Sequence, residues 1–248
     1  MRNNPRFVLV LCNAGMACVA LGASLIPIYL TTFAEVFGGL GAGELGRIAG
    51  LLFAGFIFGI ATTGPLADRF GAKPFVLLGT VASVAGLLLL ATTWNYTSLL
   101  VAAFVIGLGA GVIDMVMSPI VSALAIDNRT AALNRLHAFY CLGAISTLAI
   151  ASIMLRVGAP WRWVVAAFAV VPAVVFLGFM SAVGVWSSLY AKTSGRAITL
   201  ALASWLVGKI FFSVAAVLLV FIAMLGYYLI WAAFGLIIGR SSATMPQP

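Results

Sequence analysis

Asp114 is the one carboxylate of this sequence that lies deep inside a long apolar segment. Small and polar residues recur around it at spacings of three and four, which would place them with it on one face of a helix: Gly107, Gly111, Ser118 and Ser122. An uncompensated charge at the bilayer centre costs about 2.5–3.5 kcal/mol on insertion scales. Since a carboxyl group away from water favours its protonated form, this residue suits a proton-coupling site. A protonated Asp bonded to a neighbouring helix is the structural alternative.

His137 is the sole histidine, and its segment offers several neighbours for Asp114. Counted from the polar stretch between the two segments, Asp114 would lie about 16 Å deep, whereas His137 would lie within one turn of the end of its helix. These depths predict Thr147 or Ser146 beside Asp114, and no direct contact with His137. We expect His137 to bind solute leaving the cavity or to secure the loop that carries Asn134. A plain interfacial residue is the alternative.

The composition requires a membrane around these residues. Hydrophobic residues make up 64% of the 248-residue chain and charged residues only 7%, with a mean hydropathy of +1.22. The apolar runs are continuous and long enough to cross roughly 30 Å of hydrocarbon as helices. The net charge of +8 is spread thinly, which argues against nucleic acid as a partner. We find no metal-ligand cluster, cofactor loop or nucleophile–base pair, so we expect no metal, no cofactor and no enzyme.

Seven membrane-spanning helices are expected. They lie at about 7–34, 46–66, 74–93, 98–125, 135–156, 161–185 and 207–237. The chain then divides into a six-helix bundle, a polar cytoplasmic linker, a seventh helix and a polar tail, with bounds 1–185, 186–206, 207–239 and 240–248.

Orientation follows from the basic residues. With the N-terminus inside, nine Lys and Arg residues fall on the cytoplasmic side and four on the other. The positive-inside rule therefore predicts a multi-pass protein of the plasma (inner) membrane with a cytoplasmic N-terminus and the lipid bilayer as its main partner.

The turn between the second and third segments holds the most specific motif. It reads Gly64-Pro65-Leu66-Ala67-Asp68-Arg69-Phe70-Gly71-Ala72-Lys73. Gly71 allows a tight turn, and Asp68 can face a helix N-terminus or an arginine. Arg69 and Lys73 hold the loop in the cytoplasm. The pattern, from Gly64 to Lys73, resembles the signature of the major facilitator superfamily and implies a gating loop. A chance acid in a positively charged turn is the alternative.

Other segments agree with this resemblance. Trp161-Arg162-Trp163 is similar to the superfamily's usual entry to its sixth helix. Two further stretches, 107–119 and 133–143, resemble the branch that holds fucose, glucose and galactose proton symporters. Turns 66–74 and 155–162 both contain a basic residue, a glycine and a proline, which indicates two three-helix units in an inverted repeat.

The resemblance implies an all-α integral membrane fold, the six-helix N-terminal bundle of such a transporter plus one further helix. It implies secondary active transport, with proton-coupled uptake of a small polar solute such as a sugar. Complete members have twelve spans, so we expect either a truncated chain or a half that pairs with a second six-helix half. A seven-helix receptor or scaffold without transport is the alternative.

Overall fold

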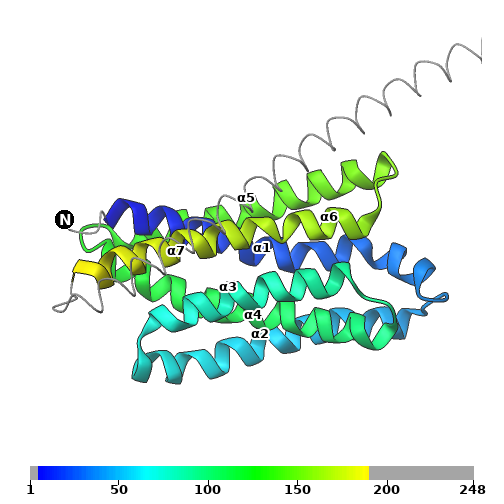
Figure 1. Cartoon of the computed structure of the whole chain (residues 1–248), viewed down its shortest axis with the longest axis horizontal. Helices are drawn as coiled ribbons and strands as arrows, with labels where there is room; N and C mark the ends of the chain where they lie inside the picture. Colours follow the sequence, from blue (N-terminus) through cyan, green and yellow to red (C-terminus); the bar gives the residue numbers. More distant parts are fainter. Residues whose placement is uncertain (1–4, 190–248) are drawn as a thin grey trace, which may run out of the picture.

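The computed structural model describes residues 5–189, and this part is a bundle of long, roughly parallel and antiparallel helices (Figure 1). The helices are α1 (Pro5–Val36), α2 (Ala42–Phe70), α3 (Ala72–Ala91), α4 (Tyr96–Leu124), α5 (Arg129–Arg156), α6 (Trp161–Phe168) and α7 (Val170–Leu189). Six spans are long and apolar enough to cross a membrane, the sixth running from Trp161 to Met180. The predicted all-α membrane bundle is confirmed. Most of the predicted linker, the seventh helix and the polar tail lie outside the described residues.

The sixth span was expected to be one helix over 161–185, and the structure divides it into α6 and α7. The division falls at Ala169, three residues before Pro172. Proline has no backbone N–H, so the carbonyl of Phe168 loses the donor that a continuous helix would supply. The result is a short helix, α6, followed by the longer α7 on nearly the same axis (Figure 1).

The bundle has two ends, named here by a residue at each. The Trp94 end holds the loops 37–41, 92–95 and 157–160, and the Asp68 end holds the turn between α2 and α3 and the loop 125–128. At the Asp68 end, Gly71 has a φ of +79°, and its N–H donates to the Ala67 carbonyl at 2.8 Å. This left-handed backbone favours glycine, as the turn motif predicts.

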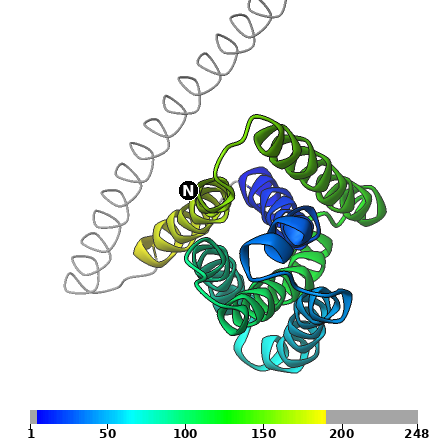
Figure 2. The same cartoon turned by 90° about the vertical axis from the view of Figure 1, so that its right-hand side faces the viewer.

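Helices pair across the two three-helix units, which are α1–α3 and α4–α7. Outside its own unit, α2 packs most extensively against α4, and α5 packs mainly against α1. Figure 2, which looks along the helix axes, shows α2 and α5 on opposite sides of the α1 and α4 pair. The second helix of each unit therefore packs on the first helix of the other. This reciprocal exchange supports the predicted inverted repeat.

The contact between α2 and α4, called the glycine seam below, is made by four glycines, Gly55 and Gly59 of α2 and Gly107 and Gly111 of α4. A Cβ atom on Gly107 would overlap the carbonyl oxygen of Leu52, and one on Gly111 would overlap that of Phe56. On Gly59 it would come 2.7 Å from the Leu108 carbonyl oxygen. The two backbones thus touch, which small residues permit in membrane helices.

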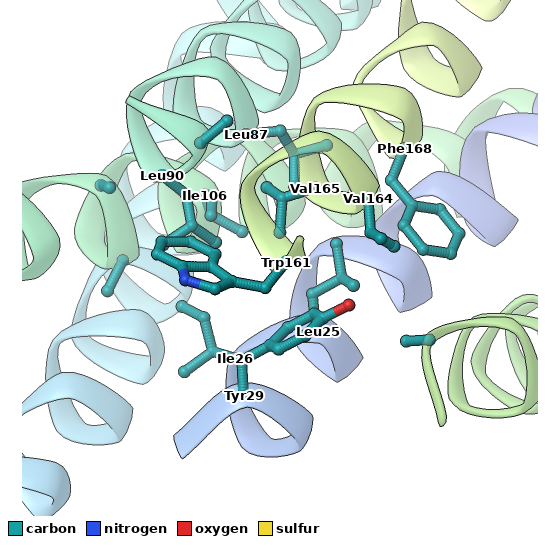
Figure 3. Packing of buried hydrophobic residues seen from close by; sticks show 14 of the residues in the cluster. Leu25, Ile26, Tyr29, Leu87, Leu90, Ile106, Trp161, Val164, Val165 and Phe168 are labelled. Carbon is teal, nitrogen blue, oxygen red and sulfur yellow. The ribbon is translucent and has the colours of Figure 1, made fainter. Parts of the chain in front are cut away.

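A core of apolar side chains fills the Trp94 half of the bundle. Figure 3 shows Trp161, Val165 and Phe168 of α6 packed on residues from three other helices: Leu25, Ile26 and Tyr29 of α1, Leu87 and Leu90 of α3, and Ile106 of α4. The rings of Tyr29 and Trp161 have centroids 6.2 Å apart. Arg162, half-buried beside them, donates to the Ala91 carbonyl at 3.0 Å. This packing joins α6 to α1 and α3.

Candidate functional site

One side of the bundle is much less covered by other helices than the rest. In the most apolar stretches of α2 and α5, 22% and 17% of the residues are buried, against 67% in α1 and 61% in α4. The helices contact one another in the order α2, α4, α1, α5, so α4 and α1 form the floor between two exposed flanks. The candidate site is the part of this surface where α4 and α5 approach each other.

Asp114 is half-buried on α4. It lies ten residues before the end of this helix at Leu124, which is about 15 Å from the Asp68 end along the helix axis. The predicted depth is therefore correct. A half-buried carboxylate at this depth lies at the edge of the packed core, where it can reach a polar partner or water.

His137 lies deeper than the sequence predicts. The sequence placed it within one turn of the helix end, but α5 already begins at Arg129, so His137 is eight residues, or about 12 Å, inside the helix. Its side chain is exposed and interacts electrostatically with the carboxylate of Asp114. The two residues therefore lie at similar depths, which corrects the predicted depth of His137, but within residues 5–189 no hydrogen bond or ion pair joins their side chains.

Thr147 lies too far along α5 to be level with Asp114. It is ten residues beyond His137, about 15 Å further along the helix. Its side chain is buried, and its hydroxyl donates to the Gly143 carbonyl at 2.8 Å within the same helix. Ser146, the other expected neighbour, is exposed. Neither candidate is therefore level with Asp114 in the structure.

Sequence reasoning missed Asn13 of α1. This side chain is only 7% exposed and lies eight residues after the start of α1 at Pro5, so it is at nearly the same depth as Asp114 and His137. Buried amides are uncommon, because each needs hydrogen-bond partners. The sequence does indicate this residue, because Asn13 is a single asparagine within an otherwise apolar run.

The helix face of small and polar residues predicted around Asp114 divides into a packing part and a polar part. Gly107 and Gly111 pack against α2 in the glycine seam, so these two residues do not line an open cavity. Ser118, one turn beyond Asp114, is half-buried, and Asn134, one turn before His137, is exposed. The polar part of the site therefore comprises Asp114, Ser118, Asn134 and His137.

The predicted gating turn forms the Asp68 end of α2 and the start of α3. Gly64 is half-buried against α4, where a Cβ atom would come 3.0 Å from the Cε atom of Met115. Asp68, Arg69, Gly71 and Lys73 are exposed. Within residues 5–189, Asp68 forms no hydrogen bond or ion pair, so the expected arginine or helix N-terminus does not face it there.

A pocket of about 300 Å³ lies at the Asp68 end, separate from Asp114. It is lined by the loop between α4 and α5 and the first turns of α5, including Asp127, Asn128 and Arg135. Asn128 caps α5 by accepting from the Ala131 N–H at 3.1 Å. In the part of the chain that the structure describes, no three His, Cys, Asp or Glu side chains could hold a metal ion.

Comparison with known proteins identifies the family. The model of the Major Facilitator Superfamily matches residues 12–239, so the chain belongs to this superfamily. Membership indicates a transporter rather than an enzyme and gives no support to the receptor alternative.

Individual relatives agree. The chain is 29% identical over 175 residues to "Organic cation/carnitine transporter 7" of Arabidopsis thaliana, covering 69% of this chain and 34% of that protein. It is 27% identical over 132 residues to "Glucose transporter GlcP" of Staphylococcus epidermidis, covering 53% and 29%. The solved structure of the proton:xylose symporter XylE has a TM-score of 0.66 at 15% identity, covering 86% of this chain and 53% of that chain.

These matches confirm the resemblance to the superfamily, and the similarity to the glucose transporter supports the sugar-symporter branch. At this identity the XylE structure shows the shared fold alone. The chain spans about a third of the length of the curated relatives it matches, 34% and 29% for the two named here.

Proposed function

We propose that this chain forms the N-terminal half of a secondary active transporter that couples uptake of a small polar solute, such as a sugar, to protons. The observation that carries the proposal is Asp114, a half-buried carboxylate about 15 Å inside the bundle and within electrostatic reach of an imidazole. A carboxyl group at this depth can exchange a proton between the two membrane sides as the site opens to each in turn. The glucose and xylose transporters among the similar proteins support the choice of solute.

A second six-helix half completes the proposed transporter. The exposed flanks α2 and α5 and the polar residues between them suit a partner bundle better than lipid, because lipid offers no hydrogen bonds to His137 or Asn134. Asp68 has no partner within the described bundle and would find one in that half. Substrate sites of such transporters lie between repeats near the midplane, so Asp114 would lie beside the solute in the proposed complete transporter.

The decisive test of the proton site is Asp114→Asn in proteoliposomes that contain the complete transporter. The amide mimics the protonated acid, so we expect the variant to lose accumulation against a gradient and to keep exchange of solute across the membrane. Asp114→Glu should keep part of the coupled activity. Asp127→Asn, which removes an exposed carboxylate from the loop after α4, is the matched control and should accumulate solute normally. An Asp114→Asn protein that still concentrates solute would refute the proposed site.

The turn at the Asp68 end is proposed to act in gating and not in solute binding. In the complete transporter, Asp68→Asn should therefore slow the maximum rate of transport and leave the solute affinity nearly unchanged. Separate measurements of initial rates and of equilibrium binding check this expectation. A large loss of binding would contradict a gating role.

We also propose that the Asp68 end faces the cytoplasm of a cell enclosed by the plasma (inner) membrane, with the N-terminus on the same side. Single cysteines at Asn128 and Asn95, in a background without the exposed thiol of Cys141, report the two ends. A membrane-impermeant thiol reagent added to intact cells should label position 95 and spare position 128. The reverse labelling would invert the proposed topology.

A further inference from the structure

We propose that Asn13 of α1 and Thr63 of α2 bind the transported solute, and that together they select a neutral solute with several hydroxyl groups. This inference rests on the proposed function, because it adds two contacts to the solute whose passage Asp114 would couple to protons. The two side chains narrow the solute from a small polar molecule to one chemical class.

Asn13 and Thr63 differ from the other buried polar side chains of residues 5–189. The other four are hydroxyls that donate to a carbonyl three or four residues earlier in the chain: Thr80, Ser83, Thr93 and Thr147. Asn13 and Thr63 are 7% and 2% exposed, and neither side chain makes a hydrogen bond within the described helices. A buried amide or hydroxyl is costly unless something completes its hydrogen bonds, so both side chains need a partner from outside this bundle.

Both polar groups keep a small opening to the outside. Among the described residues, the hydroxyl of Tyr29 is the only side-chain nitrogen or oxygen atom that is fully enclosed without a hydrogen bond. The amide of Asn13 and the hydroxyl of Thr63 are therefore not sealed inside the core. Each can reach a molecule that enters between the helices, while packing holds the rest of the side chain.

The register of the glycine seam places Thr63 level with Asp114. A Cβ atom on Gly59 would meet α4 between the Leu108 carbonyl oxygen, at 2.7 Å, and the Val112 nitrogen, at 3.0 Å. Gly59 and Thr63 belong to the same buried row of α2, and α2 and α4 run in the same direction. One further turn along both helices therefore brings Thr63 to the turn of α4 that is centred on Asp114.

Asn13 lies at nearly the same level on α1. A Cβ atom on Gly15 would come 3.0 Å from the Cε atom of Met117, and α1 and α4 run in opposite directions. Asn13 precedes Gly15 by two residues, which is about 3 Å along the helix axis. It therefore lies between the levels of Asp114 and Ser118.

Asn13 is on the side of α1 that faces α5. It lies one turn before Ala17, whose carbonyl oxygen would be 2.7 Å from a Cβ atom on Gly143 of α5. The helices contact one another in the order α2, α4, α1, α5. Thr63 on α2 and Asn13 on α1 therefore lie on the two sides of Asp114, at one level of the bundle.

The chemistry of these groups suits a neutral solute with several hydroxyls. The amide of Asn13 donates through its nitrogen and accepts through its oxygen, and the hydroxyl of Thr63 does either. A sugar hydroxyl has the same two capacities, so it satisfies both side chains. Tetraethylammonium, an organic cation without a hydrogen-bond donor or acceptor, would be attracted by Asp114 but would leave Asn13 and Thr63 unpaired, which a polar site rejects.

Apolar replacements of similar size separate solute binding from a structural role. Asn13→Leu and Thr63→Val remove polar groups that have no partner in the described bundle, so they should cost the folded chain nothing. We expect the purified full chain of each variant to unfold in detergent, without solute, at the wild-type temperature or above it. Clearly lower unfolding temperatures for both variants would overturn the proposal, because they would show that the polar groups already hold the fold together.

In the complete transporter, the same variants should lose affinity for solute. Exchange of labelled D-glucose and D-xylose across proteoliposomes measures affinity without a proton gradient. We expect Asn13→Leu and Thr63→Val each to raise the half-saturating concentration about tenfold, as loss of one hydrogen bond predicts, with little change in the maximum rate. Thr63→Ser keeps the hydroxyl and should keep most of the affinity. Thr80→Val, which removes a buried hydroxyl already bonded to the Val76 carbonyl at 2.8 Å, is the matched control and should bind as the wild type does.

The outcomes test the solute class and the two residues separately from the proton site. The wild type should exchange at least one of the two sugars, and tetraethylammonium should not compete. Exchange of neither sugar, or wild-type affinity in both apolar variants, would overturn the proposal. Wild-type affinity in both variants together with lost accumulation in Asp114→Asn would refute the two binding residues and leave the proton site standing. Lost affinity in both variants would support them even if Asp114→Asn still concentrates solute, because exchange needs no proton gradient.

Discussion

The two exposed flanks of the bundle, α2 and α5, contact α4 in different ways. On the α2 side, the glycine seam brings two backbones together over about one turn, from Gly107 to Gly111. On the α5 side, the contact with α4 is much smaller. Close backbone packing restricts the relative position of two helices, and a smaller contact restricts it less. The comparison teaches that α2 and α4 form a fixed frame and that α5 is the adjustable flank.

The largest expected effect comes from breaking the fixed frame. A Gly107→Leu substitution directs a side chain into the carbonyl of Leu52, which is backbone and cannot turn away. Since overpacking alone typically costs 1–3 kcal/mol, we expect a loss of about 3 kcal/mol or more in the free energy of unfolding. The measurement is thermal unfolding of the purified protein in detergent. Gly50→Leu is the control, because a Cβ atom there meets nothing within 4 Å; equal stability of the two variants would disprove the rigid seam.

A smaller effect is expected where α5 joins α1. Gly143→Leu meets the backbone of Ala17, so it should weaken this attachment by about 2 kcal/mol. Because α5 is held mainly by α1, hydrogen exchange should rise in α5 and stay low in α2 and α4. Ala149→Leu, at an exposed position of the same helix, provides the control. A uniform rise in all helices would argue against an independently adjustable α5.

The smallest effect concerns one hydrogen bond across the fixed frame. The hydroxyl of Tyr96 in α4 donates to the Glu44 carbonyl of α2 at 3.0 Å, so Tyr96→Phe should lower stability by about 1 kcal/mol. Tyr29→Phe makes the same chemical change at a buried hydroxyl that has no hydrogen-bond partner among residues 5–189, and it should leave stability unchanged or raise it. Calorimetry of both variants decides the comparison. A greater loss for Tyr29→Phe would mean that its hydroxyl has an unseen partner.

Hydropathy and one turn motif were sufficient to predict the first six spans, the family and the glycine turn at Gly71. The start of α5 was missed, because hydropathy locates only the part of a helix that is apolar. The first turns of α5 carry Arg129, Asn134 and Arg135 and project beyond that part. Asn128 was a better indicator of the helix start, because asparagine often caps helices and Asn128 caps α5. Moving the start by six residues changes the depth of His137 to nearly that of Asp114.

The glycines around Asp114 show a second limit. A helical projection correctly places Gly107, Gly111 and Asp114 near one another, but it cannot tell a cavity from a neighbouring helix. Both environments favour small residues, the first because space is needed and the second because backbones approach closely. Only the position of α2 assigns the glycines to packing and leaves Asp114 and Ser118 as polar candidates. The interruption at Ala169 depends likewise on a single residue, Pro172, which a hydropathy average does not register.

The reciprocal pairing of α2 with α4 and of α5 with α1 also bears on how the protein is made. Helices leave the ribosome in chain order, so α2 enters the bilayer before its main partner exists. Gly55 and Gly59 therefore lack their packing partner until α4 is inserted, and α1 lacks its contact with α5 for longer still. The second helix of each three-helix unit therefore makes its main contact only when the first helix of the other unit is present. A ribosome that stalls after α3 would release a fragment without its main packing surface, and quality-control proteases should remove that fragment sooner than one that extends through α5.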